Sequence, residues 1–436
     1  MIPAIFQQLR RGCGLLVALA LATLLVTSAA AARGPRAGSP DPLFGTAGVT
    51  RVSLNTYLTV SRLARQPSGA LVAACEVWQQ IGNSNGPHFA LVRFLADGGL
   101  DPSFGSAGVL REDFGDLSDP ELISWASSVQ VDGQGRILAT GGVAGYEMSQ
   151  FVLARYLSDG TADPSFGVDG KVVGALGPNS DLYRTAIQQD GKIVAVGSST
   201  LSGDRSVLLL RYLSDGKPDP DFGTNGRVVT PLGNTSNATS LLLLPGGKLL
   251  VGGWNGDDAC VLQYLPNGNL DPSFGIGGEA LVDLQHGTDF FSQIALQPNG
   301  RILAAGGSYR QEDQEFVEHP VIVRLTSAGK MDRSFGKRGV VTDAVGGYVQ
   351  DLALQQNGRL VTAGPSSDRF TVSRFTPAGK PDRSFGKNGT AVVATPSVGR
   401  SEALLLEPGG KIVAAGRAEV DGAFQAELLI TRLLAR

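Results

Sequence analysis

The chain has 436 residues, of which 42% are hydrophobic, and its 40 acidic residues nearly balance its 37 basic residues. A formal charge of −3 gives no basic surface for nucleic acid or an anionic membrane, so neither is an expected partner. The composition is too hydrophobic for a disordered chain, and its 59 Gly and 23 Pro indicate a structure rich in turns.

The N-terminus has the pattern of an export signal. Arg10–Arg11 precede the apolar run Gly14–Val26, and the small residues Ser28–Ala32 offer cleavage sites for a signal peptidase. The apolar run is too short for a transmembrane helix, which needs roughly 20 apolar residues. We predict a signal peptide over 1–32, a short linker over 33–40, and an exported, periplasmic or extracellular protein without a membrane span after cleavage. An uncleaved N-terminal anchor is the alternative.

One motif, D-x-x-F-G-x-x-G, occurs seven times in the rest of the chain. Successive copies start 50 to 62 residues apart, and so fixed a register of Asp, Phe and two Gly does not arise by chance. The repeats therefore define one domain over 41–436. The copies are Asp41–Gly48, Asp101–Gly108, Asp163–Gly170, Asp219–Gly226, Asp271–Gly278, Asp332–Gly339 and Asp382–Gly389.

Each repeat offers four short β-type segments, which we name A to D in chain order. A and B are apolar runs around a tight turn, as in Ala186–Gly197, where Asp190-Gly191 separates them. Asp-Gly between β-type runs is a strong hairpin signal, because both turn residues need positive φ. C is a run that reaches an Arg, as in Phe151–Tyr156, and D follows the motif, as in Lys171–Val173.

Four strands in each of seven repeats predict an all-β fold, a seven-bladed β-propeller of four-stranded antiparallel blades. A β-solenoid is the alternative, but it usually repeats in shorter steps and lacks tight hairpins inside the unit. The last repeat has no strand D, whereas the first motif is followed by an unpaired strand near Val49–Val52. We predict that this N-terminal strand pairs with the C-terminal strand C and closes the ring, and we expect a monomer.

The motif DPSFG followed by G-x-V, together with the hairpin Gln297–Ile302, resembles the delta-60 repeat of bacterial secreted and surface proteins. The resemblance covers essentially the whole chain after the signal. Its departures are mild, since Leu43 and Asp221 replace Ser, and Arg333 and Arg383 replace Pro. The resemblance implies export and a propeller-like fold, and it supplies no catalytic residues.

Residues repeated in every unit are better explained by the fold than by chemistry, because an active site needs only one copy. We expect the motif Asp to accept backbone N–H bonds in an Asx-type turn, and the motif Phe to fill apolar space between blades. Calcium bound by the motif Asp is disfavoured, because each copy brings one carboxylate and Ca²⁺ takes roughly six to eight oxygens.

An Arg recurs near the end of strand C, with Gln263 in its place in one repeat. We expect its stem to pack between blades and its guanidinium to bond loop carbonyls or the motif Asp. A ring of ligand-binding arginines is the alternative. The residues are Arg93, Arg155, Arg211, Arg324, Arg374 and Arg432.

The two faces of such a propeller differ. The A–B and C–D connections share the face that the repeats keep constant, whereas the B–C and D–A connections share a face that varies between copies. We expect a ligand or partner on this variable face, because binding residues usually sit on loops held by a rigid scaffold. His88 and His319 are expected there in B–C loops, and His286 in a D–A loop. The candidate binding residues are Trp254, Tyr309, His286 and His319.

The sequence assigns no metal or other cofactor. His286 and His319 with a nearby acid are a weak metal signal, because the two His lack helical spacing. We find no H-E-x-x-H, P-loop or dinucleotide motif. These observations favour a binding or scaffold protein, rather than an enzyme, that acts on an unknown protein, glycan or surface ligand. The alternative is a hydrolase or lyase with carboxylates at the central channel mouth, for which the candidate acids are Asp116, Asp119, Asp181 and Asp289.

Overall fold

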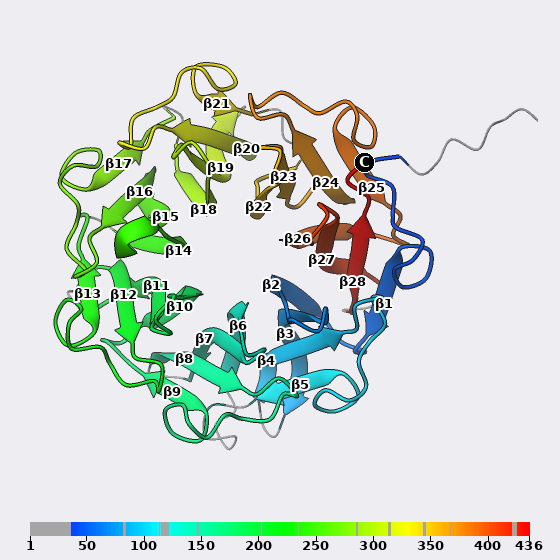
Figure 1. Cartoon of the computed structure of the whole chain (residues 1–436), viewed down its shortest axis with the longest axis horizontal. Coiled ribbons are helices and arrows are strands. Elements are labelled where there is room, and N and C mark those ends of the chain that lie inside the picture. The colour runs from blue at the N-terminus through cyan, green and yellow to red at the C-terminus, as the bar shows by residue number, and fades with distance from the viewer. Residues whose placement is uncertain are drawn as a thin grey trace, which may run out of the picture. The chain divides into compact units, whose positions relative to one another are not determined.

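The computed structural model shows a ring of β-sheets (Figure 1). Its described residues form 28 strands in seven four-stranded antiparallel sheets, and their compact unit spans Ala37–Arg436. The predicted seven-bladed β-propeller is confirmed. The structure describes residues 36–436 apart from 82–83, 113, 115–121, 146–147, 202, 234, 285–286, 313–314, 343–345, 367 and 421–424.

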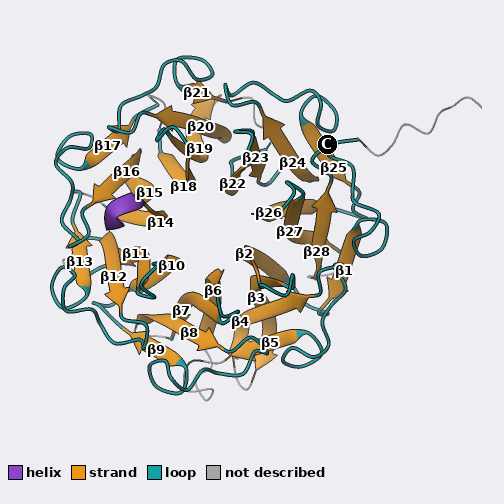
Figure 2. Ribbon diagram, viewed as in Figure 1, coloured by secondary structure: helices purple, strands orange, loops and turns teal. Residues whose placement is uncertain are grey.

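Each blade uses strands A to D in order from the channel to the rim (Figure 1). Blades 1 to 3 are β2 (Leu58–Arg65), β3 (Leu71–Ile81), β4 (Ser84–Phe94), β5 (Val109–Glu112); β6 (Ile123–Val131), β7 (Ile137–Ala144), β8 (Ser149–Tyr156), β9 (Lys171–Gly174); and β10 (Ser180–Ile187), β11 (Ile193–Ser199), β12 (Ser206–Tyr212), β13 (Arg227–Thr230). Blades 4 to 6 are β14 (Ser236–Leu243), β15 (Leu249–Asn255), β16 (Asp258–Tyr264), β17 (Glu279–Val282); β18 (Asp289–Leu296), β19 (Ile302–Glu312), β20 (Glu315–Leu325), β21 (Val340–Val341); and β22 (Asp351–Leu354), β23 (Leu360–Ala363), β24 (Phe370–Phe375), β25 (Thr390–Val393). Blade 7 is β26 (Gly399–Leu406), β27 (Ile412–Glu419), β28 (Ala426–Leu433) and, outermost, β1 (Val49–Ser53). The one helix among the described residues is a 3₁₀ turn, Pro245–Gly247, between β14 and β15 (Figure 2).

The ring closes as the sequence predicts. Strand β1 lies antiparallel to β28, from Val49 opposite Thr431 to Ser53 opposite Glu427. The backbone N–H of Asp41 also donates to the carbonyl of Arg432 at 2.7 Å. The N-terminal strand thus supplies the strand D that the last repeat lacks.

The core lies between successive blades. Seven apolar clusters each combine residues of two neighbouring blades, as Phe104 of blade 1 packs with Val152 and Ala154 of blade 2. All seven residues of β11 and all seven of β12 are buried. Strands B and C are covered on both faces, which explains why their sequences are continuously apolar.

The repeated Arg, Asp and Phe meet at the outer part of six blades. The Arg Nε lies 2.7–2.9 Å from the motif Asp, and the guanidinium carbon lies 4.4–4.8 Å from the centre of the motif Phe ring. A second guanidinium N–H donates to a carbonyl of the next blade, as Arg93 does to Ser158 at 2.5 Å. The expected partners of this Arg, the motif Asp and a loop carbonyl, are both present, so the Arg ties neighbouring blades together.

The other motif residues also have structural roles. Asp163 accepts the backbone N–H of Ser165 at 3.0 Å, as the predicted Asx-type turn requires. Phe104 is fully buried against Gly160 of the next blade. Gly160 has a φ of +96°, and a Cβ there would lie 2.5 Å from the Phe104 ring, so the position requires glycine.

Blade 4 replaces the Arg with Gln263 and keeps the charge pair by another route. Lys248, directly before β15, places its Nζ 2.6 Å from the carboxylate of Asp271. Hydrogen bonds from Lys248 and Ser273 lower the pKa of Asp271 to about 2. The motif Asp therefore has a cationic partner in this blade as well.

Candidate functional site

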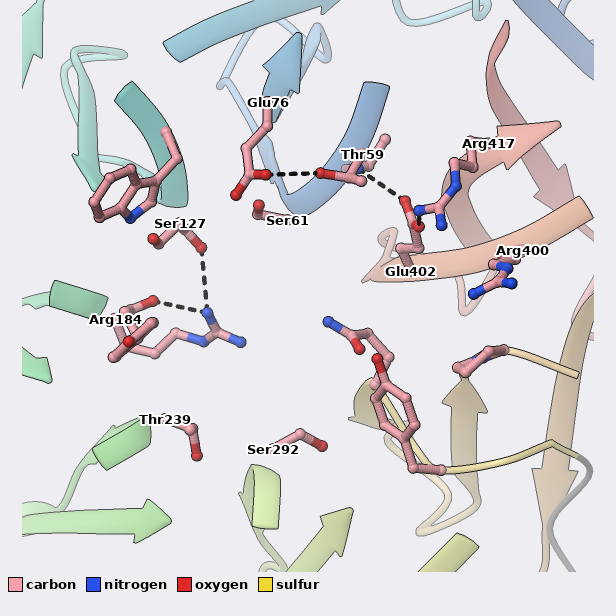
Figure 3. Close-up of a pocket in the computed structure, with 16 residues that line it drawn as sticks. Thr59, Ser61, Glu76, Ser127, Arg184, Thr239, Ser292, Arg400, Glu402 and Arg417 are labelled. Carbon is pink, nitrogen blue, oxygen red and sulfur yellow. Dashed lines mark hydrogen bonds and ion pairs between the residues drawn. The ribbon is translucent and has the colours of Figure 1, made fainter. Parts of the chain in front are cut away.

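Strand A carries a β-bulge at one position in six blades. The register between strands A and B shifts there, and Gln350 precedes β22 at the corresponding position of blade 6. A bulge adds one residue that departs from the regular alternation of side chains. All seven residues line the central channel (Figure 3). They are Ser61, Ser127, Tyr183, Thr239, Ser292, Gln350 and Glu402.

These residues surround a cavity of about 490 Å³. Its wall includes Tyr348 from a D–A connection and Pro365 from a B–C connection, so the cavity lies at the variable-face end of the channel. Trp125, Arg400 and Arg417 also line it. The volume falls in the range of small-molecule sites, roughly 300–1,000 Å³.

Arg62 spans the channel next to this cavity. From blade 1 its guanidinium reaches Asp351 of blade 6 at 2.5 Å and Gln293 of blade 5 at 2.7 Å. Blades 5 and 6 lie across the ring from blade 1 (Figure 1). The Arg62 bridge therefore crosses the channel and fixes blades that are not neighbours.

Two carboxyl groups lie in the cavity wall. Glu402 pairs with Arg417 and accepts the backbone N–H of Val60 at 2.8 Å. Burial raises the pKa of Glu402 to about 7, although Arg417 and Val60 act in the opposite direction. Burial also raises the pKa of Glu76, whose carboxylate accepts a hydrogen bond from Thr59 at 3.4 Å. The cavity thus contains a group that can exchange a proton near neutral pH.

Two arginines of the wall, Arg184 and Arg400, form no ion pair among the described residues. Nη1 of Arg184 donates only to carbonyl oxygens, of Tyr183 at 2.7 Å and of Ser127 at 3.2 Å, and Figure 3 shows its guanidinium extending into the cavity. Within the described part of the chain, no carboxylate forms an ion pair with Arg184 or Arg400. The wall therefore combines three arginines with two carboxyl groups that burial disposes toward protonation.

Three of the four predicted binding residues, Trp254, Tyr309 and His319, lie on the variable face but outside the cavity wall. Trp254 and His319 are half-buried, and Tyr309 is 39% exposed. The Tyr309 ring centre is 5.8 Å from that of Phe290, which is 5.7 Å from the ring of the lining residue Tyr348. Tyr309 therefore belongs to an aromatic group that continues the wall. His286 lies outside the described residues.

The expectation that His88 and His319 lie in B–C loops is wrong. His88 is in β4 opposite Val77 and is buried, and His319 is in β20 opposite Ser308. The hairpins β3–β4 and β19–β20 have 11 residues in each strand, so pairing continues where the sequence suggested loops. Trp254 is likewise in a strand, at the end of β15.

The candidate acids do not gather in the cavity, as far as they are described. Asp181 pairs with Arg205, and Asp289 accepts the N–H of Leu284 at 2.8 Å. Asp116 and Asp119 lie outside the described residues. The acids of the wall, Glu76 and Glu402, were missed. For Glu402 the available signal was the bulge position, which falls five residues before the residue that opens each A–B turn and is polar in every repeat.

Comparisons with known proteins agree with this architecture. Six stretches match a family model described as "Domain of unknown function (DUF5122) beta-propeller". The chain is a β-propeller repeat protein. The matched stretches are 66–104, 135–166, 188–222, 244–274, 297–335 and 355–385. A search of curated proteins finds no match.

Solved structures share the propeller fold. The polysaccharide lyase Uly1 is 11% identical, with 86% of this chain and 90% of that chain covered and a TM-score of 0.50. YCF48 bound to D1 peptide is 11% identical, with 89% and 98% covered and a TM-score of 0.45. The β-propeller domain of the Trilobed protease from Pyrococcus furiosus is 9% identical, with 87% and 96% covered and a TM-score of 0.43. At 11% identity, the likeness to Uly1 shows the fold alone. In the described part of the propeller, no helix has the length and hydrophobicity needed to cross a membrane.

Proposed function

We propose that the protein is an exported, monomeric binding propeller of the delta-60 repeat family, and that its ligand occupies the central cavity on the variable face. The observation that carries this proposal is the ring of seven bulge residues, polar in every blade, around a cavity of about 490 Å³. The signal-like N-terminus and the DPSFG repeats support export. A rigid ring whose repeats differ at the cavity and in the loops suits a binding protein.

The wall selects for an acidic ligand that carries hydroxyl groups. Arg184 and Arg400 offer guanidinium donors, the side chain best suited to a planar carboxylate. Tyr183 and Tyr348 offer flat apolar surface, and Ser61 offers a hydroxyl. An acidic saccharide unit combines a carboxylate, hydroxyl groups and apolar ring faces, and it is the ligand class that we propose.

Calorimetric titration of the full chain with uronic-acid oligosaccharides, and with neutral ones of the same length, tests this function. We expect the acidic series alone to bind, and Arg184→Ala or Arg400→Ala to weaken binding at least about 10-fold, or 1.4 kcal/mol. Arg369→Ala, an exposed arginine of the variable face outside the cavity, is the matched control. Equal binding of neutral sugars, or full binding by both cavity variants, would overturn the proposal.

A hydrolase or lyase acting on the same ligand is a second candidate function. Glu402 favours it, because a carboxyl with a pKa of about 7 can act as a general acid or base at neutral pH. Incubation with the oligosaccharides that bind, followed by chromatography of the products, distinguishes the two functions. Turnover that Glu402→Gln abolishes while binding persists identifies an enzyme. Binding without any cleavage supports a binding protein rather than an enzyme.

A further inference from the structure

Three carboxylates meet where blade 4 joins blade 5. Asp258 begins β16, Asp283 directly follows β17, and Asp289 begins β18. One ligand atom from each of them lies within 4.8 Å of the other two. The group lies on the variable face and is distinct from the central cavity, whose wall contains none of the three.

Asp289 provides a second, independent observation. Its side chain is fully buried, and its Oδ2 accepts the backbone N–H of Leu284 at 2.8 Å. In blade 3 the first residue of strand A is Ser180, whose hydroxyl accepts the corresponding bond from Leu176 at 2.7 Å. A hydroxyl therefore suffices for the fold at this position.

The second oxygen of Asp289 is not explained by the fold. Oδ1 is buried and has no hydrogen-bond partner among the described residues. A buried carboxylate oxygen without a partner is strongly unfavourable unless a cation or donor meets it. Burial, together with the carboxylates of Asp283 and Asp289, raises the pKa of Asp258, so further negative charge surrounds the same point.

We propose that Asp258, Asp283 and Asp289 bind a divalent cation of the Ca²⁺ type. An all-carboxylate set suits a hard cation, whereas zinc and copper sites usually include His or Cys. Asp283 is exposed, so water can complete the roughly six to eight oxygens that Ca²⁺ takes. The ion would join the B–C turn of blade 4 to the connection that enters blade 5, and it would stabilise this part of the variable face.

The full chain, freed of metal with a chelator and dialysed, is titrated with CaCl₂ by calorimetry and by Tb³⁺ luminescence. We expect a dissociation constant of roughly 10⁻⁵–10⁻³ M and a Tm increase of roughly 3 °C at about 100 times that concentration. Asp289→Ser, which restores the residue of blade 3, should fold and weaken Ca²⁺ binding at least about 30-fold. Asp258→Asn should act in the same direction. Asp204→Asn, an exposed acid of the same face, is the matched control and should bind Ca²⁺ like the wild type.

Two results would overturn the site. The first is a wild-type protein that shows no binding heat, no luminescence and no Tm change with Ca²⁺, Mg²⁺ or Mn²⁺ up to about 10 mM. This concentration is well above the dissociation constants of extracellular calcium sites. The second is Ca²⁺ binding by a folded Asp289→Ser variant at wild-type affinity. Neither result bears on the cavity proposal, which is tested with oligosaccharides and different variants.

Discussion

The outer part of each blade and the wall of the channel follow opposite rules. At the outer part, six blades place the same Arg, Asp and Phe at distances that agree within a few tenths of an ångström. At the wall, the seven positions of the bulge carry five different residue types. The backbone conformation is repeated in both regions, but the side chain is repeated only at the outer part of the blades.

The difference follows from burial. Arg155 is 5% exposed and Asp163 3%, so each needs the other, and no substitution of one partner is neutral. The bulge residues face a cavity, which accommodates side chains of different size and polarity. Repetition therefore marks the residues that stabilise the ring, and its absence marks the positions free to acquire chemistry.

Removing the closing segment should have the largest effect. Deleting residues 41–53 removes β1, the Asp41 pairs with Lys411 and Arg432, and the buried Phe44. Because each blade packs on its neighbours around the ring, we expect the free energy of unfolding to fall by more than about 4 kcal/mol. Hydrogen exchange should accelerate in all blades. Leu43→Ala, a 77% exposed site in the same segment, is the control. Faster exchange confined to blade 7 would contradict a closure that stabilises the entire ring.

Breaking one repeated ion pair should have a smaller but definite effect. Arg155→Ala leaves the buried Asp163 with a 3.7 Å contact to Arg136 as its only cationic contact among the described residues, and we expect a loss of about 3–5 kcal/mol in urea unfolding. The same truncation in blade 4, Gln263→Ala, leaves the Lys248–Asp271 pair intact and should cost about 1 kcal/mol. Equal losses in the two blades would show that the charge pair is not what stabilises the outer part.

The channel should show a pH dependence of its own. The folded pKa of Glu402, about 7, lies above the ordinary 4.5, so the folded state binds more protons between these values. The associated stability is fully present below about pH 4.5 and is lost as the pH rises through 7. Relative to Glu402→Gln, the wild type should lose about 3 kcal/mol between pH 5 and 8 in urea unfolding. Glu427→Gln in the same blade serves as the control. If the free energies of unfolding of the wild type and Glu402→Gln differ by the same amount at pH 5 and pH 8, Glu402 does not titrate in this range.

The smallest effect on stability is expected at the exposed surface of the variable face. Combined Ala substitutions at Trp254, Tyr309 and His319 should reduce capture of a native envelope or medium partner at least about 10-fold while the protein stays folded. The control replaces Gln189, Lys330 and Lys380, which are exposed on the constant face. If only the control variant loses the partner, the binding surface lies on the constant face and this prediction is wrong.

The sequence predicts the ring well because its repeated residues are those that the fold requires. The motif Asp, Phe and Gly, the strand-C Arg and the unpaired N-terminal strand all have the structural roles expected of them. The candidate site was harder to predict from the sequence. Glu76 and Glu402 are 326 positions apart in sequence and meet only because the ring closes between blades 7 and 1. His88 and His319 were placed in loops because nothing local shows that the pairing of their hairpins continues.

The closing strand also imposes an order of events on assembly. Asp41 leaves the ribosome early, yet the Arg432 that it pairs with follows 391 residues later. Until that partner arrives, the nascent protein is an open arc with two unprotected edges, because strand D of the last blade is held at the opposite end of the chain. Contacts so distant in sequence form slowly, and unpaired edges invite association with other chains. The complete wall of the cavity, which needs residues of both blade 1 and blade 7, therefore requires a closed ring.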